Sequence, residues 1–524
     1  MKRSNNYGIT LIALVVTIVV LLILAGITIR LVFSNDGIIS KAREAKNATE
    51  DSELADRQAL NDLDDLIDDT LGGAPKADDD SPGSLNGDGS DQNPYRVSSI
   101  EDLVAFSQDV NSGNSYSEKN VILDVDLNFE SDNSYINPNT TEFGDINGDG
   151  TISTIKQEVT TGNGFVPIGT IGSSPTDGNM FSGIFDGQNH SIENYNINVS
   201  HIPQVGALAL FLSNNGTIKN LNINSMDISS TSSINDDVYI TSLCFLNNGT
   251  IENCSVTGDI SGTDTNIYFS SIAGNNYGTI KNSYNKANIN FTTDKITIAA
   301  SGICTNNYGK ILMSANEGNI NATFSDIYGS AIVPVAITYR TASFSGIANN
   351  NVGEINGCYN SGILSTNNAE QSIISGISAN NYQGQTNGKI YNSYNLGNLS
   401  GDATLSNTIV SGISSSEKGI IQNCYNVGVT NVSCSFFSQM GISKGLSIGL
   451  SSNMSNCYTL NDVSEDDKYK QLPGVELGGI TTLDSDAMKN ESLIDSLNKS
   501  IDSEYNGEIL FIKNANGYPT VSMN

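Results

Sequence analysis

From about residue 207 onward this chain of 524 residues repeats itself, with Gly-x-Ile marking seven copies of the repeat, and this feature limits the possible folds more than any other. Its glycines are about 30–45 residues apart. They are Gly216, Gly249, Gly278, Gly309, Gly353, Gly388 and Gly419. A repeat of this length is the sequence sign of a solenoid, a propeller or a helical array, because each unit buries its apolar face only against its neighbours.

The chemistry inside each unit chooses among these architectures. The isoleucine is followed by a mostly polar residue, as in Ile218-Lys219 and Ile251-Glu252, so the pattern alternates in and out like a strand. Asparagine then recurs where the strand should turn, at Asn220, Asn253, Asn282, Asn392, Asn423 and Asn456. The chain has no tryptophan to mark propeller blades. We therefore expect a mainly β fold, a right-handed parallel β-helix of roughly ten coils with isoleucines stacked inside it.

Composition excludes some partners. The net charge of -31 argues against nucleic acid and against charge-driven binding to anionic lipid. The seven cysteines are too sparse for a small disulfide framework, and several occupy equivalent repeat positions. We expect them to form an interior stack of free thiols, with a Cys424–Cys457 bridge between adjacent coils also open. Tyr284, Tyr359, Tyr394, Tyr425 and Tyr458 form another column, for which stacking across coils is favoured over sugar binding.

The N-terminus predicts a membrane anchor. Lys2-Arg3 precede an apolar run that begins at Ile9 and carries no charge before Arg30. About 20 apolar residues suffice to cross a bilayer as a helix, and positive charges before the span favour a cytoplasmic N-terminus. We expect the rest of the chain to lie outside the cell.

The same segment resembles the prepilin-type signal of type IV pilins, through Gly8 followed by Ile9-Thr10-Leu11-Ile12. The resemblance implies cleavage between Gly8 and Ile9 by a prepilin peptidase, methylation of Ile9, and pilus or pseudopilus subunits as partners. Family members carry Glu at the fifth mature position, where this chain has Ala13. This departure puts assembly into a filament in doubt, and an uncleaved signal anchor is the other interpretation.

The repeats are similar to GLUG-type repeats of bacterial surface proteins, as in residues 273–284, which read Ala-Gly-Asn-Asn-Tyr-Gly-Thr-Ile-Lys-Asn-Ser-Tyr. Such repeats also flank the catalytic part of IgA-cleaving metalloproteases. The His-Glu-x-x-His motif of those enzymes is absent, since the two histidines are His190 and His201. The resemblance therefore implies a surface architecture without that protease chemistry.

Residues 145–151, Asp-Ile-Asn-Gly-Asp-Gly-Thr, match the start of an EF-hand or dockerin-type calcium loop. Asp145, Asn147, Asp149 and Thr151 would supply the oxygen ligands of positions 1, 3, 5 and 7. The acid of position 12 is replaced by Lys156. A structural Ca²⁺ site and an acidic turn without an ion both stay open, and no other cofactor is expected.

These features predict seven regions. They are a leader (1–8), a transmembrane helix (9–33), a stalk helix (34–71), a disordered acidic linker (72–94), an N-terminal cap with the first coils (95–205), the repeat β-helix (206–460) and a C-terminal cap (461–524). Ser99 should start one capping helix, and residues 484–499 should form another before two short strands.

The sequence as a whole predicts a single-pass, pilin-like surface protein of a Gram-positive bacterium that displays a β-helix. Its expected role is adhesion to a surface glycan or protein, without enzymatic activity. Two alternatives stay open. One is a β-helix polysaccharide lyase or hydrolase, and the other is a spacer protein with no specific ligand.

Overall fold

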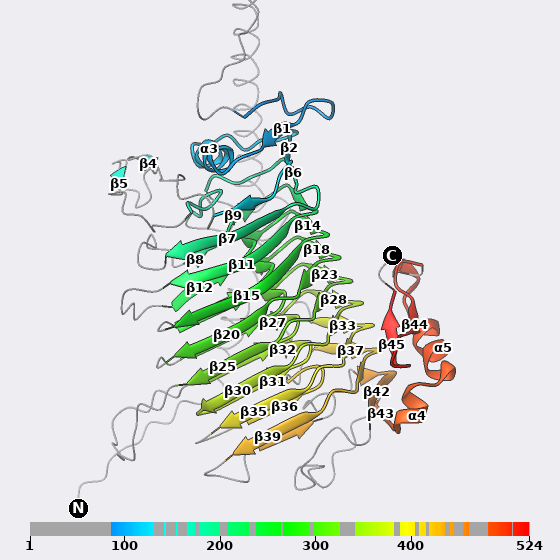
Figure 1. Ribbon diagram of the computed structural model, residues 1–524. Coiled ribbons are helices and arrows are strands. Elements are labelled where there is room, and N and C mark those ends of the chain that lie inside the picture. Colours follow the sequence, from blue (N-terminus) through cyan, green and yellow to red (C-terminus); the bar gives the residue numbers. More distant parts are fainter. Residues whose placement is uncertain are drawn as a thin grey trace, which may run out of the picture. The chain divides into compact units, whose positions relative to one another are not determined.

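The computed structural model describes the chain from residue 85 onward, with gaps (Figure 1). The described ranges are 85–129, 141–142, 154–155, 165–172, 178–198, 207–229, 237–263, 266–293, 297–324, 341–381, 388–403, 408–415, 419–434, 441–444, 454–460, 480–505 and 507–522. The expected leader, membrane span and stalk helix (1–71) lie outside them. No helix in the described part of the chain has the length and apolarity needed to span a membrane.

The described residues form a parallel β-solenoid, as the repeat predicted. One coil runs through four sheets in turn, for example from β16 (Asn266–Ser270) to β17 (Ala273–Asn276), β18 (Thr279–Lys281) and β19 (Tyr284–Asn285). Each strand pairs in parallel with the equivalent strands of the coils before and after it. The parallel β-helix is thus confirmed, and its right-handed sense stays a prediction.

We number the sheets I to IV. Sheet I has eleven strands in the order β1 (Tyr95–Val97), β2 (Asn120–Leu123), β6 (Ile184–Asp186), β10 (Thr217–Lys219), β14 (Thr250–Glu252), β18, β23 (Lys310–Leu312), β28 (Glu354–Asn356), β33 (Lys389–Tyr391), β37 (Ile420–Gln422) and β41 (Met454–Ser455).

Sheet II, the largest, joins two sets of strands at β15. One set is β3 (Leu127–Asn128), β7 (Ser191–Asn198), β11 (Asn222–Ser229), β15 (Ser255–Thr263), β20 (Asn288–Thr293), β25 (Ile320–Phe324), β30 (Leu364–Ala369), β35 (Leu399–Ala403) and β39 (Thr430–Cys434). The other is β19, β24 (Ala315–Asn316), β29 (Tyr359–Asn360), β34 (Tyr394–Asn395), β38 (Tyr425–Asn426), β42 (Cys457–Leu460) and β43 (Ile480–Leu483).

Sheets III and IV close each coil. Sheet III contains β8 (Ala207–Leu208), β12 (Asp237–Thr241), β16, β21 (Thr297–Ser301), β26 (Thr341–Ser345), β31 (Gln371–Ser375), β36 (Thr408–Ser411) and β40 (Gly441–Lys444). Sheet IV contains β9 (Phe211–Asn214), β13 (Cys244–Asn247), β17, β22 (Cys304–Asn307), β27 (Ala348–Asn351) and β32 (Ser378–Asn381). Two hairpins, β4 (Thr141–Glu142) with β5 (Thr154–Ile155) and β44 (Phe511–Lys513) with β45 (Pro519–Val521), are antiparallel.

The repeated isoleucines form the predicted interior column. The column comprises Ile218, Ile251, Ile280, Ile311, Ile355, Ile390 and Ile421, paired in register along sheet I. All of them are buried within the main hydrophobic core. Phe185 takes the same position one coil earlier, opposite Ile218. Burial of this continuous apolar stack is the main force that holds the coils together.

Asparagine side chains form ladders inside the turns. In one ladder the amide of each residue donates to the carbonyl oxygen of the next at 2.8–2.9 Å. Its members are Asn214, Asn247, Asn276, Asn307, Asn351 and Asn381, all fully buried. A second buried ladder has bonds of 2.6–2.7 Å and contains Asn285, Asn316, Asn360, Asn395 and Asn426. Stacked amides satisfy one another in a site without water, so each coil fixes the register of the next.

The six cysteines whose side chains the structure describes lie inside the solenoid as free, buried thiols, as expected. Cys254, Cys358, Cys424 and Cys457 share one column with buried serines, and Cys244 and Cys304 lie in sheet IV. Burial raises the pKa of the Cys254 and Cys358 thiols from 9.0 to about 12. These thiols therefore act as small apolar groups.

The N-terminal end is covered by a helix at the expected place. In α3 (Ile100–Asn111), the Ser99 side chain accepts a hydrogen bond from the backbone N–H of Asp102 at 3.1 Å and caps the helix. Phe106 of α3 packs against Phe185 and Phe211 of the first coils.

Two local expectations differ from the structure. Residues 85–94, expected in the disordered linker, form turns, and Asn86 accepts a hydrogen bond from the backbone of Arg96. Residues 484–499 form two helices, α4 (Ser485–Met488) and α5 (Glu491–Lys499), because Asn490 caps a new helix with its side chain.

Candidate functional site

A lateral face of the solenoid runs along the turn between sheets I and II. The asparagines that the repeat placed at this turn adopt left-handed backbone conformations, with φ of 49–59°. They are Asn220, Asn253, Asn282, Asn392, Asn423 and Asn456. A short polar side chain tolerates this conformation better than other residues apart from glycine, which explains its recurrence. We call the outward side chains on both sides of this turn the corner face.

The C-terminal segment covers the later coils of the corner face. Figure 1 shows α4, α5, β44 and β45 beside the solenoid, next to β33, β37 and β42. The strand before them, β43, pairs with β42 and so extends sheet II, as a cap would. The remainder packs sideways, which sequence reasoning did not predict. Its second hydrophobic cluster joins Met488, Leu497 and Phe511 to Tyr394 and Tyr425 of the solenoid.

The tyrosine column lies under this segment. Tyr359, Tyr394 and Tyr425 stack with ring centroids 5.2 and 5.0 Å apart, which confirms the predicted stacking across coils. The Tyr425 hydroxyl donates to the carbonyl oxygen of Pro519, and the Tyr394 hydroxyl lies 2.6 Å from Oγ1 of Thr520. Tyr394 and Tyr425 are buried, so their rings are not a platform for a sugar.

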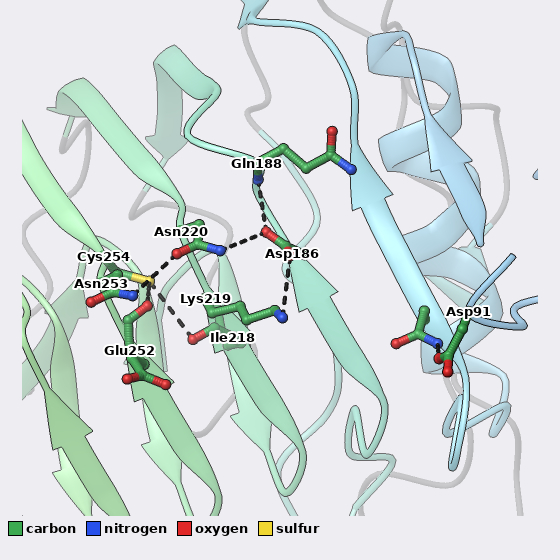
Figure 2. A network of polar contacts seen from close by, with 10 residues as sticks. Asp91, Asp186, Gln188, Ile218, Lys219, Asn220, Glu252, Asn253 and Cys254 are labelled. Atoms are coloured by element: carbon green, nitrogen blue, oxygen red, sulfur yellow. Dashed lines mark hydrogen bonds and ion pairs between the residues drawn. The ribbon is translucent and has the colours of Figure 1, made fainter. Parts of the chain in front are cut away.

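The earlier coils of the corner face are polar and partly exposed. On sheet I, Asp186 lies 3.3 Å from Nζ of Lys219 and accepts hydrogen bonds from Asn220 and the backbone of Gln188, each at 2.9 Å (Figure 2). Burial alone would raise the pKa of Asp186, but these hydrogen bonds and the Lys219 charge lower it overall. Asp186 is therefore an ionised group at neutral pH. Lys219 takes the position of Asp186 on the next coil, and Glu252 takes it on the coil after that.

On sheet II, the carboxylate of Glu193 is the centre of a second polar group. It accepts hydrogen bonds from Ser191 Oγ at 2.8 Å, Asn224 Nδ2 at 3.3 Å and Asn128 Nδ2 at 3.4 Å. Ser255 and Thr257 continue the row on the next coil and donate to Asn222 and Asn224. The face thus presents carboxylate, amide and hydroxyl groups on successive coils.

His190 lies at the edge of this group. Its Nδ1 is 3.1 Å from Oδ1 of Asp126, which also accepts the backbone N–H of Ser191 at 2.8 Å. The backbone hydrogen bond and the histidine lower the pKa of Asp126. The Ser191 hydroxyl donates to Glu193, so this serine is not arranged with His190 as a nucleophile. The group can orient the imidazole of His190 through one carboxylate, that of Asp126.

The sequence-predicted site residues are not among those that the structure describes. Gly8 and Ile9 lie outside the described residues, as do Asp145, Asn147, Asp149 and Thr151 and also His201. Within the described ranges, no group of three or more His, Cys, Asp or Glu side chains could hold a metal ion. The calcium loop and the processing site therefore stay predictions.

Sequence reasoning missed Asp186 and Glu193 as corner-face residues. A signal for Asp186 existed, because Gly183-x-Phe185 is the repeat pattern with phenylalanine in place of isoleucine, and Asp186 then corresponds to Lys219. No comparable signal pointed to Glu193. Its partner Asn128 is more than 60 residues away in sequence, and only the pairing of β3 with β7 brings them together.

Comparisons with known proteins show no family for this chain. No protein-family model and no curated protein matches the chain. A solved structure of a "putative immunoglobulin A1 protease" from Bacteroides ovatus is similar over 83% of this chain and 94% of its own, with 16% identity and a TM-score of 0.39. The expectation that this chain has no enzymatic activity is corrected here, because that similar protein is named as a protease. At this TM-score the likeness carries no argument about what the present chain cleaves or binds.

Proposed function

We propose that the corner face of the earlier coils binds a surface glycan, and that the solenoid is displayed outside a Gram-positive cell for adhesion. The observation that carries this proposal is the row of half-exposed polar groups at Asp186, Glu193, Asn222, Asn224 and Glu252. Successive coils place equivalent groups about 4.8 Å apart, a spacing comparable to the length of one sugar unit. Hydroxyl-rich polymers are recognised by such neutral and charged hydrogen-bonding groups.

Anchoring is the second part of the proposal. Residues 9–33 act as a single-pass membrane helix, and a prepilin peptidase cleaves after Gly8 and exposes Ile9 for methylation. The basic leader and the uninterrupted apolar run support this. Pilus or pseudopilus subunits would be partners of the helix. Sequencing the N-terminus of the mature protein tests this part, because methylated Ile9 supports processing and an intact Met1 contradicts it.

Binding is tested with the full-length protein on an array of bacterial and host glycans. Replacing both Asn222 and Glu252 with alanine should weaken binding to any glycan that the wild-type protein binds on the array. We expect a loss of about tenfold or more, because a hydrogen bond to a charged group is worth about 1.5–3 kcal/mol. Asn367→Ala is the matched control, since Asn367 is exposed on β30 in sheet II, outside the corner face. Equal loss of glycan binding in the double variant and in Asn367→Ala contradicts the glycan proposal, and so does a wild-type protein that binds no glycan on the array. A protein ligand or a spacer role would then take its place.

A polysaccharide lyase or hydrolase at the same face is the second candidate. The observation that favours it is that Ser191 links two carboxylates next to His190: its backbone N–H donates to Asp126, which also holds the His190 imidazole, and its hydroxyl donates to Glu193. Carboxylates and an imidazole can exchange protons with a scissile sugar. Release of reducing ends or unsaturated products, abolished by Glu193→Gln with glycan binding retained, would establish it. Binding without product formation contradicts it.

A further inference from the structure

Cys424 and Cys457 occupy the same position on two successive coils. The residues on both sides of them pair in register, Gln422 with Ser455 and Tyr425 with Tyr458. Both thiols are buried, and the strand register places them one above the other on adjacent coils. They are free thiols in the structure.

Among the six cysteines whose side chains the structure describes, no other two occupy the same position on successive coils. In the same column, Cys254 is stacked between Leu221 and Ser283, and Cys358 between Ser314 and Ser393. In sheet IV, Cys244 and Cys304 are separated by the intervening coil that carries Ala273. Two coils amount to about 9.6 Å, beyond the limit of about 7 Å between Cα atoms in a disulfide.

We propose that Cys424 and Cys457 close to a disulfide that staples the last two coils of the solenoid. Neighbouring parallel strands are about 4.8 Å apart, within the range of about 4.4–6.8 Å that Cα atoms span in disulfides. The oxidant is a low-molecular-weight disulfide or a thiol–disulfide oxidoreductase. That the chain meets such an oxidant in the cell rests on the extracellular location proposed above.

The reaction is two thiol–disulfide exchanges. The thiolate of one cysteine attacks a sulfur of the oxidant and releases one thiol, which leaves a mixed disulfide. The second cysteine then attacks the protein sulfur of that mixed disulfide and releases the other thiol. The pair loses two protons and two electrons, and the oxidant is reduced to two thiols. Because both sulfurs are buried in the folded solenoid, closure takes place during folding or transient opening of the last coils.

The proposed disulfide would lie at the C-terminal end of the solenoid, where it would stabilise the last coil. Strand β42 is followed by β43, after which the chain leaves the solenoid for the lateral segment. A cross-link between residues 424 and 457 restrains the unfolded chain and resists separation of the final coil from the one before it.

The test compares full-length wild-type protein with Cys457→Ser and with Cys358→Ser as the matched control. Serine occurs naturally in this column, at Ser283, Ser314 and Ser393, so both variants should fold. Each protein is denatured, reduced and refolded with glutathione disulfide. Free thiols are then counted after denaturation, and peptides are mapped by mass spectrometry without reduction.

We expect wild-type protein to show two fewer free thiols than its seven cysteines and a linked peptide pair containing Cys424 and Cys457. The control should give the same linked pair, and Cys457→Ser should lose it. Addition of a phosphine reductant should lower the melting temperature of wild type by several degrees and leave Cys457→Ser unchanged. Seven free thiols after refolding, or a linked pair of other cysteines, would overturn the proposal. Protein from cells that is reduced but closes on refolding would support the geometry and instead contradict the extracellular location.

Discussion

Asn307 donates its side-chain amide to the carbonyl oxygen of Asn351 at 2.8 Å, and both side chains are wholly buried. Asn307 also accepts from Asn276 at the same distance, so it lies in the middle of a continuous ladder. A buried amide without partners is costly, whereas in a stacked row each amide donates to the carbonyl oxygen of the next side chain. The ladder thereby links the stability of each coil to its neighbours.

Replacing Asn307 with alanine should therefore destabilise the solenoid more than replacing an exposed asparagine. The change leaves the Asn276 amide and the Asn351 carbonyl oxygen without their ladder partners, which costs about 1–3 kcal/mol. Asn288→Ala is the control, since its bond to Asp259 is exposed. Urea denaturation of both variants measures the difference, and equal midpoints would show that the ladder adds no stability.

The covering of the tyrosine column predicts a second effect. Replacing both Tyr394 and Tyr425 with phenylalanine removes the hydroxyls that bond Thr520 and the Pro519 carbonyl. Each lost bond should favour opening of the C-terminal segment by about 1 kcal/mol. Limited proteolysis should then cleave within residues 480–522 faster while the solenoid stays intact. Tyr284→Phe, in the same column outside the hydrophobic cluster of this segment, should leave the cleavage rate unchanged.

The repeating strand and turn of each coil could be predicted from the sequence. The packing of the C-terminal segment against the side of the solenoid could not. The in-and-out alternation around Ile218 and the recurrence of Asn220 are properties of neighbouring residues, so a strand and a turn followed from them directly. The side on which α5 packs depends instead on contacts such as Asn423 with Leu497, 74 residues apart. The sequence predicted a capping helix at residues 484–499 but did not show which part of the solenoid this segment would cover. The polar group around Glu193 escaped prediction for the same reason.

High pH should unfold the protein through its buried thiols and tyrosines. Burial raises the pKa of Cys254 and Cys358 from 9.0 to about 12, and that of Tyr394 from 10.0 to about 12. The folded state thus holds protons that the unfolded chain releases. The stability from these groups is complete below about pH 9 and is lost as the pH rises toward about 12.

The measurement is the urea midpoint at a series of pH values across this window. A variant with serine at both Cys254 and Cys358 should lose less stability between about pH 9 and pH 12, because two of the titrating groups are gone. The same thiols should resist iodoacetamide in the folded protein and react once it is unfolded. Rapid labelling of the native protein near pH 9 would refute the burial on which this prediction depends.

The calcium hypothesis predicts a stabilising ion at residues 145–151. If Asp145, Asn147, Asp149 and the backbone of Thr151 supply oxygen ligands, millimolar Ca²⁺ should raise the melting temperature of the full-length protein, because an ion that binds the folded state shifts unfolding by mass action. Replacing both Asp145 and Asp149 with alanine should abolish the shift. Replacing Asp78 and Asp79 with alanine removes the same charge from the acidic stretch before the solenoid and serves as the control. An identical shift in the two double variants would indicate general screening of the net negative charge, and the segment would then be an acidic turn without a bound ion.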